Sequence, residues 1–247
     1  MAQRNEIVGF LNKYLKIDDV EDKYLVNGLL FEGKDDVTKI AFAVDSSVDT
    51  ISAARSEGAD MLVVHHGFLS KVLLFPIVRH LKKIIKVLVE SDVSLYGAHI
   101  PLDVHPDVGN NIELCRMFDV SVKGKFSHGF WGEFKNPVDV DVFVKDIDSR
   151  LNTKCSVFGF GKKKIKTVAF VSGGAQYDIL PAMISDIDCL VTGENGHITY
   201  LIAKDAGMNM ISAGHYATET LGVRALSKVV KDKFKVETVF IDKPTGL

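Results

Sequence analysis

Two histidines, His65 and His66, end a short apolar run that begins at residue 61, and a third, His99, ends the next such run. Asp103 follows His99 by four residues. Continuous apolar runs of this length are typical of strands buried on both faces of a parallel sheet. The carboxyl ends of such strands meet at the edge where ligands bind. Imidazole and carboxylate groups at that edge would suit Zn, Fe, Mn or Ni.

The second half of the chain repeats this pattern. The apolar run at residues 189–191 is followed by Thr192, Gly193 and Glu194, and the next run leads to His215, with Glu219 four residues later. Each half therefore reads as a strand with polar groups at its end, a helix, and a second strand that leads to a histidine and then an acid. The repeat predicts that both halves contribute ligands to a metal centre.

Three histidines and two carboxylates exceed the ligands of one tetrahedral metal. They suit two divalent ions, which lie roughly 3.5–4 Å apart in hydrolytic enzymes. The predicted metal ligands are His65, His66, Asp103, His215 and Glu219. His99 and Glu194 stand at the repeat-equivalent positions of His215 and His66. We expect them beside the metals, Glu194 as a general acid or base and His99 as a group that orients a ligand or binds an anion.

Each of these residues also has a structural interpretation. Successive strand residues point to opposite faces, so His65 and His66 bind metal together only if the chain turns at Gly67. Otherwise one of them reaches a second metal or enters the core. Asp103 alone would be a loop or turn residue, and Glu219 alone would be a first-turn helix acid. His99 and Glu194 could equally have structural roles. The convergence of two halves on the same residue types favours the metal centre.

Two other features receive structural interpretations. His105 is adjacent to Pro106, and we expect it to be exposed. The segment Ser172-Gly173-Gly174-Ala175-Gln176 follows a predicted strand and precedes a predicted helix. It lacks the full P-loop pattern, so a tight strand-to-helix turn is the favoured interpretation.

The composition is that of a globular protein, with 47% hydrophobic and 25% charged residues. The formal net charge of −2 gives no global attraction to nucleic acid, although it leaves room for a local basic patch. No apolar run approaches the roughly 20 residues that span a bilayer, and the first residues lack the apolar core of a signal peptide. We expect a cytoplasmic protein in which Cys115, Cys155 and Cys189 are thiols, because their spacing shows no pairing.

Strands and helices alternate along most of the chain, which predicts an α/β fold with largely parallel or mixed sheets. We expect helices over residues 7–15, 48–56, 76–89, 108–118, 137–151, 179–184, 197–206 and 218–230, with Pro137 opening the fifth. The repeat predicts two similar domains, 1–125 with His65, His66 and Asp103, and 126–247 with His215 and Glu219. No Gly/Ser-rich linker separates them, so we expect the halves to pack closely.

Several motifs, taken in order, resemble the Ngg-interacting-factor-three-like family, whose members are also labelled GTP cyclohydrolase 1 type 2 homologues or dinuclear-metal hexameric proteins. The motifs are His65-His66-Gly67, Gly97-Ala98-His99-Ile100-Pro101-Leu102-Asp103, Gly109-Asn110-Asn111, Ser172-Gly173-Gly174-Ala175, Thr192-Gly193-Glu194, Gly214-His215-Tyr216-Ala217-Thr218-Glu219 and Phe240-Ile241-Asp242-Lys243-Pro244-Thr245-Gly246. The resemblance implies two α/β domains, a dinuclear centre in the cleft between them with the five ligands named above, and a ring-like homohexamer. The common His-His-Pro motif stands here as His-His-Gly, which removes no ligand.

Three functional hypotheses follow. The first is a metal-dependent hydrolase that acts on a nucleotide-like or other small polar substrate, with a purine nucleotide as the substrate that the family label implies. The second is a ring-shaped metal-binding scaffold or regulatory protein that binds protein partners or nucleic acid. The third is a stable α/β protein whose histidines and acids are structural, in which case chelation would change neither activity nor stability.

Overall fold

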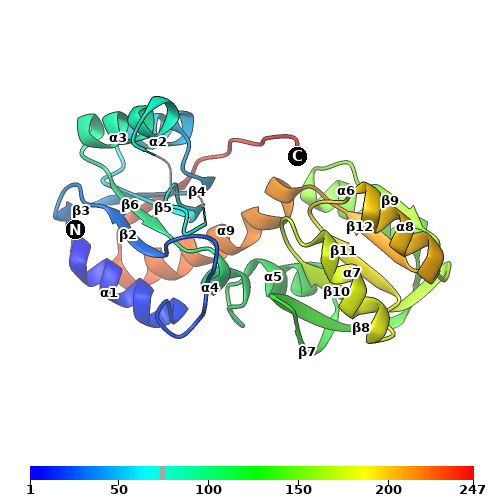
Figure 1. Cartoon of the computed structure of the whole chain (residues 1–247). Helices are drawn as coiled ribbons and strands as arrows, with labels where there is room; N and C mark the ends of the chain where they lie inside the picture. The colour runs from blue at the N-terminus through cyan, green and yellow to red at the C-terminus, as the bar shows by residue number, and fades with distance from the viewer. Residues whose placement is uncertain (73–75) are drawn as a thin grey trace. The chain divides into compact units, whose positions relative to one another are not determined.

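A computed structural model describes residues 1–72 and 76–247 and confirms an α/β fold with mixed sheets (Figure 1). The chain forms two compact units. Unit 1 comprises Met1–Val108 and Gly222–Lys243, and unit 2 comprises Gly109–Leu221 and Pro244–Leu247. This division differs from the expected domains 1–125 and 126–247. The physical reason is that the last strand pairs with a strand of unit 1, while residues 109–125 pack with unit 2.

The sheet of unit 1 has five strands in the order β13-β4-β5-β6-β2. Their bounds are β2 Gly28–Phe31, β4 Lys39–Asp45, β5 Met61–His66, β6 Ser94–Gly97 and β13 Glu237–Phe240. The first four strands of that order are parallel, and β2 is antiparallel to β6. A separate antiparallel ribbon joins β1 (Ala2–Gln3) and β3 (Asp36–Val37). The parallel strands therefore bring their carboxyl ends to a common edge.

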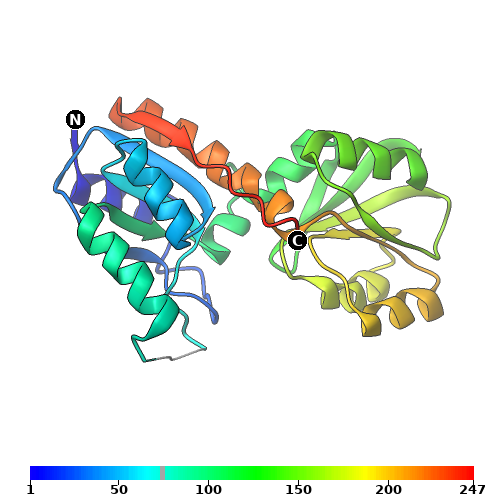
Figure 2. The same ribbon diagram turned by 90° about the horizontal axis from the view of Figure 1, so that it is seen from above.

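Helices cover both faces of this sheet (Figures 1 and 2). On one face lie α2 (Val48–Ser56) and α3 (Arg79–Ser91), which pack beside each other over a cluster that contains Ala41 and Ala43. On the other face lie α1 (Arg4–Leu15) and the part of α9 (His215–Phe234) from Gly222 onward. Strand side chains alternate between faces, so both faces of the central strands are buried, as their continuous apolar sequences predicted.

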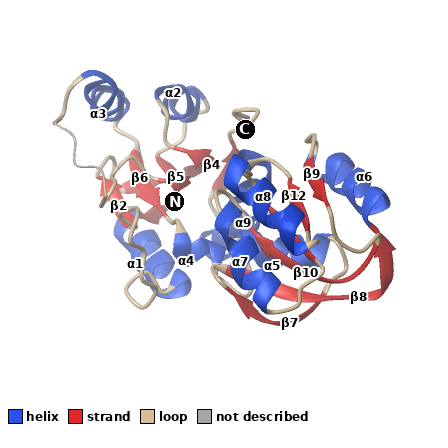
Figure 3. Ribbon diagram, turned by 45° about the vertical axis from the view of Figure 1, so that its right-hand side comes forward, coloured by secondary structure: helices blue, strands red, loops and turns tan. Residues whose placement is uncertain are grey.

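The sheet of unit 2 has six strands in the order β7-β8-β10-β11-β12-β9 (Figure 3). Their bounds are β7 Ser121–Phe126, β8 Gly129–Asp139, β9 Ser156–Gly159, β10 Lys164–Val171, β11 Cys189–Thr192 and β12 Asn209–Ser212. The central strands β10, β11 and β12 are parallel, and the outer pairings are antiparallel. Unit 2 thus repeats the three-strand parallel centre of unit 1.

Two helix layers also enclose the sheet of unit 2. One contains α5 (Asn110–Met117) and α6 (Val140–Leu151), which bury Cys115 and Phe143 against Phe170 and its neighbours. The other contains α7 (Ile179–Ile184), preceded by a 3-10 turn at Gln176–Asp178, and α8 (His197–Ala206). Ile179 and Ala203 anchor this second layer in a cluster with sheet residues. The three cysteines are free thiols, of which Cys155 is half-buried.

Most elements lie where the sequence predicted them, and α2, α7 and α8 have the predicted bounds. The expectation for Pro137 was wrong, because this residue lies inside β8 and α6 begins at Val140. The register between β8 and β10 shifts between Glu133 and Val138, so the missing N–H of Pro137 costs no ladder hydrogen bond. Asp139 instead caps α6 by accepting a hydrogen bond from the backbone N–H of Asp141. Among the described residues, no helix is long and apolar enough to cross a membrane.

Candidate metal centre

The carboxyl edge of the parallel strands in unit 1 carries the first group of candidate ligands. Strand β4 ends at Asp45, β5 ends at His66, and His99 follows the end of β6 by two residues. His65 is fully buried, whereas His66 and His99 are half-buried. The side chains that the sequence placed at strand ends therefore lie at one edge of the sheet of unit 1.

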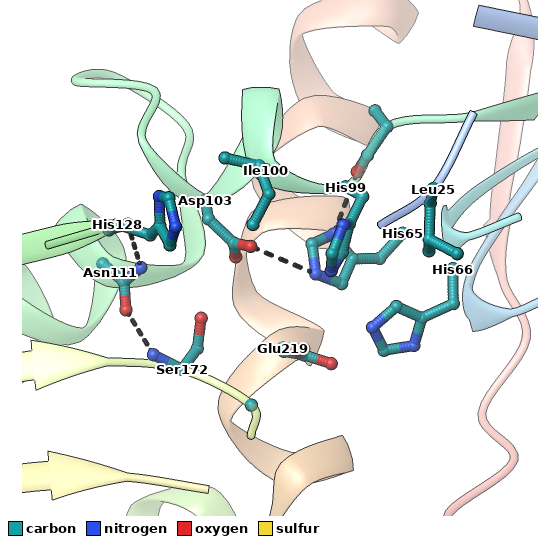
Figure 4. A network of polar contacts seen from close by, with 12 residues as sticks. Leu25, His65, His66, His99, Ile100, Asp103, Asn111, His128, Ser172 and Glu219 are labelled. Carbon is teal, nitrogen blue, oxygen red and sulfur yellow. Dashed lines mark hydrogen bonds and ion pairs between the residues drawn. The ribbon is translucent and has the colours of Figure 1, made fainter. Parts of the chain in front are cut away.

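Three imidazoles of unit 1 form one cluster (Figure 4). The ring centroids of His65 lie 4.6 Å from His66 and 5.1 Å from His99, and those of His66 and His99 are 5.5 Å apart. One nitrogen from each ring lies within 4.8 Å of the other two, a spacing that could hold a metal ion. His99, which we expected beside the metal rather than as a ligand, is part of this cluster.

Each imidazole of the cluster is held through its Nδ1 atom. His65 donates to the carbonyl oxygen of Ala98 at 2.9 Å. His66 donates to the carboxylate of Asp45 at 2.8 Å, and His99 donates to the carboxylate of Asp22 at 2.9 Å. Because Nδ1 of each ring makes one of these contacts, Nε2 is the atom through which each ring could bind a metal ion. Acceptors of this kind fix the ring orientation and tautomer of metal-binding histidines.

Asp103 lies at the end of a short helix, α4 (Ile100–Asp103), rather than in the loop that we expected. Its side chain is 8% exposed, and Oδ2 lies 3.5 Å from Nε2 of His65. Pro101 at the start of the helix fixes the backbone that carries the carboxylate. Asp103 therefore belongs to the histidine cluster of unit 1 (Figure 4).

Asp22 has a role that no sequence signal indicated. Its buried carboxylate accepts hydrogen bonds from the backbone N–H groups of Tyr24 and Leu25, from the side chain of Asn27 and from His99. Burial alone would raise the pKa of Asp22, but these hydrogen bonds outweigh it and hold the pKa well below its usual range. Asp22 is therefore ionised at neutral pH, and its carboxylate orients His99.

The second group of candidate ligands lies in unit 2, where β12 leads directly into α9. This helix begins at His215 rather than near Thr218, so Glu219 lies one turn further along on the same face. Nε2 of His215 lies 3.2 Å from a carboxylate oxygen of Glu219, whose side chain is 3% exposed. Nδ1 of His215 donates to Glu194 at 2.5 Å. His215 thus resembles His65, because its Nδ1 donates to an acceptor and its Nε2 lies beside a buried carboxylate.

A glycine loop after β10 packs against this pair. Gly173 has a φ of +67°, and a Cβ at this position would lie 2.2 Å from Oε1 of Glu219. Its N–H donates to Thr218 Oγ1, and its carbonyl accepts from the N–H of Gly193 and from Thr192 Oγ1. Only glycine combines this backbone conformation with so close an approach. The loop that the sequence predicted to be a tight turn therefore packs directly against the His215–Glu219 pair.

Asn111 holds the same loop from the opposite side. Its side chain is fully buried, its Oδ1 accepts from the N–H of Ser172 at 2.7 Å, and its Nδ2 donates to the carbonyl of His128 at 3.0 Å (Figure 4). The Gly109-Asn110-Asn111 motif thereby acquires a physical role. It ties the start of α5 and the β7–β8 turn to the loop that walls in Glu219.

The electrostatic environment of His215 favours its protonated form in the metal-free protein. Burial alone would lower the pKa of His215, but the hydrogen bond and negative charge of Glu219, together with those of Glu194, raise the pKa to about 9. A metal ion at Nε2 would have to displace that proton. Glu194 therefore helps to stabilise the protonated form of His215, while the Glu194 side chain is 44% exposed.

Two further residues correct the sequence interpretation. His105, which we interpreted as exposed, is buried, and its Nε2 donates to the carbonyl of Tyr14 at 3.0 Å. Its Nδ1 accepts from the backbone N–H groups of Asp107 and Val108, so it is a structural histidine. The sequence analysis also missed Asp45, although an acid directly after the apolar run 40–44 is the same signal that identified His65 and His66.

Comparison with known proteins decides the family. The sequence pattern described as Duf34/NIF3 (NGG1p interacting factor 3) matches residues 2–246. The chain belongs to the DUF34/NIF3 family. A relative from Pyrococcus abyssi, named GTP cyclohydrolase 1 type 2 homolog, is 44% identical over 99% of this chain and 100% of its own length.

Solved structures agree with this assignment. This DUF34/NIF3 chain is similar to a structural-genomics protein called ybgI, of unknown function, with a TM-score of 0.95 and 34% identity over 99% of this chain and 100% of the other. It is also similar to the protein TTHA1606 from Thermus thermophilus, with a TM-score of 0.92 and 35% identity over the same shares. The family resemblance expected from the motifs is confirmed.

The raised pKa of His215 predicts a pH dependence of stability for this DUF34/NIF3 protein without metal. The folded state binds the His215 proton more tightly than the unfolded state, whose imidazole pKa is about 6.5. The stabilisation is therefore complete below pH of about 6.5 and is lost as the pH rises through about 9. Urea unfolding in EDTA across this range should show a decline that His215→Gln removes. Equal declines in both proteins would contradict the prediction.

The contact between Gly173 and Glu219 predicts that Gly173→Ala is destabilising. The new methyl group would meet a carboxylate oxygen, and the positive φ adds strain of about 1–2 kcal/mol. Gly174→Ala is the matched control, since its Cβ would lie 3.5 Å from the nearest atom, an ordinary contact. Chemical unfolding should show a loss for Gly173→Ala alone. Similar stability of Gly173→Ala and Gly174→Ala would contradict a close approach of Gly173 to Glu219.

Proposed function

We propose that this protein binds two divalent metal ions through His65, His66, Asp103, His215 and Glu219, a set to which both units contribute. The observation that carries the proposal is the hydrogen bonding of the histidine Nδ1 atoms. His65, His66 and His215 each donate Nδ1–H to a fixed carbonyl or carboxylate, which suits metal binding through Nε2. The buried carboxylates of Asp103 and Glu219 lie beside Nε2 of a histidine in their own units. Zn, Fe, Mn and Ni fit this donor set.

The proposed activity is hydrolysis of a nucleotide-like or other small polar substrate. A pair of divalent ions would supply Lewis acidity and lower the pKa of a water molecule. The substrate class is supported by the name GTP cyclohydrolase 1 type 2 homolog that the Pyrococcus abyssi relative carries. On this basis a purine nucleotide is the first substrate to test.

His99 and Glu194 are the residues that we propose for proton transfer and orientation. Asp22 holds the proton on Nδ1 of His99, so Nε2 is the atom that can accept a proton or a hydrogen bond from substrate. Glu194 uses one oxygen to hold His215, and its partial exposure leaves the carboxylate accessible to solvent and substrate. Both residues therefore combine an orienting contact with a group available for general acid–base work.

The first test is the metal content of the protein, purified without a metal-affinity column. We expect close to two metal ions per chain, and we expect the double variant Asp103→Ala/Glu219→Ala to lose them because each change removes a buried carboxylate ligand. The matched control is Glu90→Ala/Asp146→Ala, which removes one exposed carboxylate from each unit. Elemental analysis of the three proteins gives the counts.

The outcome separates the hypotheses. No metal in the wild type, and no uptake of added Zn, Fe, Mn or Ni, would reject the proposed site. If metal is bound, nucleoside triphosphates and phosphoesters are offered to the loaded protein. Turnover that Glu219→Ala abolishes supports the hydrolase. Bound metal without turnover of any of them would reject that activity and leave the metal-binding scaffold.

We also propose that the chain assembles into a homo-oligomer, with the homohexamer ring implied by the family resemblance as its form. The support is an apolar surface on helices α7 and α8 of unit 2, which pack beside each other. Its exposed side chains are Leu180, Met183, Ile184, Ile198 and Leu201, of which Ile184 is 80% exposed. Exposed apolar side chains gathered on one surface are typical of interfaces. A second copy of the chain is the occupant that we propose.

Ile184→Lys should therefore lower the assembled mass, because a charge would be placed in a desolvated contact. Val142→Lys is the matched control, since Val142 is 59% exposed but lies on α6, in the other helix layer of unit 2. Light scattering coupled to size-exclusion chromatography measures the mass. A wild-type monomer, or the same mass for wild type and Ile184→Lys, would reject this interface.

A further inference from the structure

An exposed aromatic ring lies beside the histidine cluster of unit 1. Tyr24 is 54% exposed, and its ring meets that of His99 edge to face, with the centroids 6.3 Å apart. His99 in turn contacts the rings of His65 and His66. A π surface open to solvent therefore stands next to the residues proposed to bind metal and transfer protons.

The backbone that carries this ring is fixed on both sides. The N–H of Tyr24 donates to Asp22 Oδ1 at 2.8 Å, which is the carboxylate that also holds His99. The carbonyl of Tyr24 accepts from the N–H of Lys71 at 2.8 Å and from the hydroxyl of Ser70 at 3.3 Å. A tyrosine on a fixed backbone offers a large contact area at little cost in conformational entropy.

A positive charge and further apolar surface come from the segment that pairs with Tyr24. Lys71 donates from Nζ to the carbonyl of Asp22 at 2.9 Å, which places its ammonium group against the loop that carries the ring. On either side of it along the chain, Leu69 is 37% and Val72 is 62% exposed. Lysine is positively charged at neutral pH. The combination of ring, cation and apolar surface suits a ligand that is planar at one end and anionic at another.

We propose that Tyr24 and Lys71 form a substrate-binding surface beside the histidine cluster, which takes a planar heteroaromatic ring through Tyr24 and an anionic group through Lys71. This is the chemistry of a nucleotide, and the inference rests on the substrate class in the proposed function. Tyr24 contacts the ring by stacking, and His99 stands at the edge of the same surface. The choice of substrate therefore depends on residues outside the metal ligands.

Binding of three probes to metal-loaded protein tests the inference by titration calorimetry. The probes are guanosine, which has the ring alone, ribose 5-phosphate, which has the anion alone, and GMP, which has both. Tyr24→Leu should weaken guanosine and GMP by about tenfold or more, the usual loss when a base loses its aromatic partner. Tyr24→Phe should bind as the wild type does, because it keeps the π surface.

The charge is tested separately from the ring. Lys71→Met should weaken GMP and ribose 5-phosphate by about tenfold and leave guanosine unchanged, because it removes the charged donor but keeps an apolar stem as long as that of lysine. Lys71→Arg should retain binding of both anions. Tyr177→Leu is the matched control for the ring, because Tyr177 is 58% exposed but lies on the 3-10 turn of unit 2. Thermal unfolding of every variant checks that it is folded.

Two results would overturn the inference. One is equal binding of guanosine and GMP to the wild type and Tyr24→Leu. The other is the absence of binding of either ligand to the wild type at millimolar concentration. Metal analysis of the same samples keeps this test distinct from that of the proposed function. Bound metal without a Tyr24 effect rejects only the substrate surface. Ring-dependent binding to a protein that takes up no added metal rejects only the metal proposal.

Discussion

An imidazole can present a lone pair in a chosen direction only when its other nitrogen is held, and four histidines of this protein share that constraint. His65, His66, His99 and His215 each donate Nδ1–H to a fixed acceptor. The acceptors come from different places: a carbonyl after β6, a carboxylate at the end of β4, a loop before β2 and the segment after β11. The orientation of the candidate ligands therefore depends on the pairing of whole strands, since that pairing brings each acceptor to its histidine.

The parallel centre of each sheet meets this requirement with short segments of chain. In unit 1, strands β4, β5 and β6 end at one edge, and in unit 2, strands β10, β11 and β12 do the same. The loops beyond these ends then need little length to carry an acid or an imidazole. Close packing follows from the same arrangement. Gly173 touches the carboxylate of Glu219 because the loops after β10 and β11 hydrogen-bond to each other around it.

Much of the fold could be predicted because its signals are local. Short apolar runs predicted the central strands, and helical spacing predicted the bounds of α2, α7 and α8. The failures also have physical reasons. Pro137 is tolerated inside β8 because the strand register shifts around it. His105 can be buried because a distant carbonyl, that of Tyr14, accepts a hydrogen bond from its ring. The neighbouring sequence predicts neither a register shift between strands nor a hydrogen-bond partner 91 residues away.

The sequence by itself determined the fold class, the family and the residue types at the candidate centre. A buried strand that ends in histidine or acid can be predicted from a few consecutive residues. Only the tertiary structure decided how those side chains are held. Asp22 lies 77 residues from His99, and Asn111 lies 61 residues from Ser172. Hydrogen bonds over such separations arise from strand pairing and loop packing. Their partners are ordinary loop and helix residues until the folded chain brings them together.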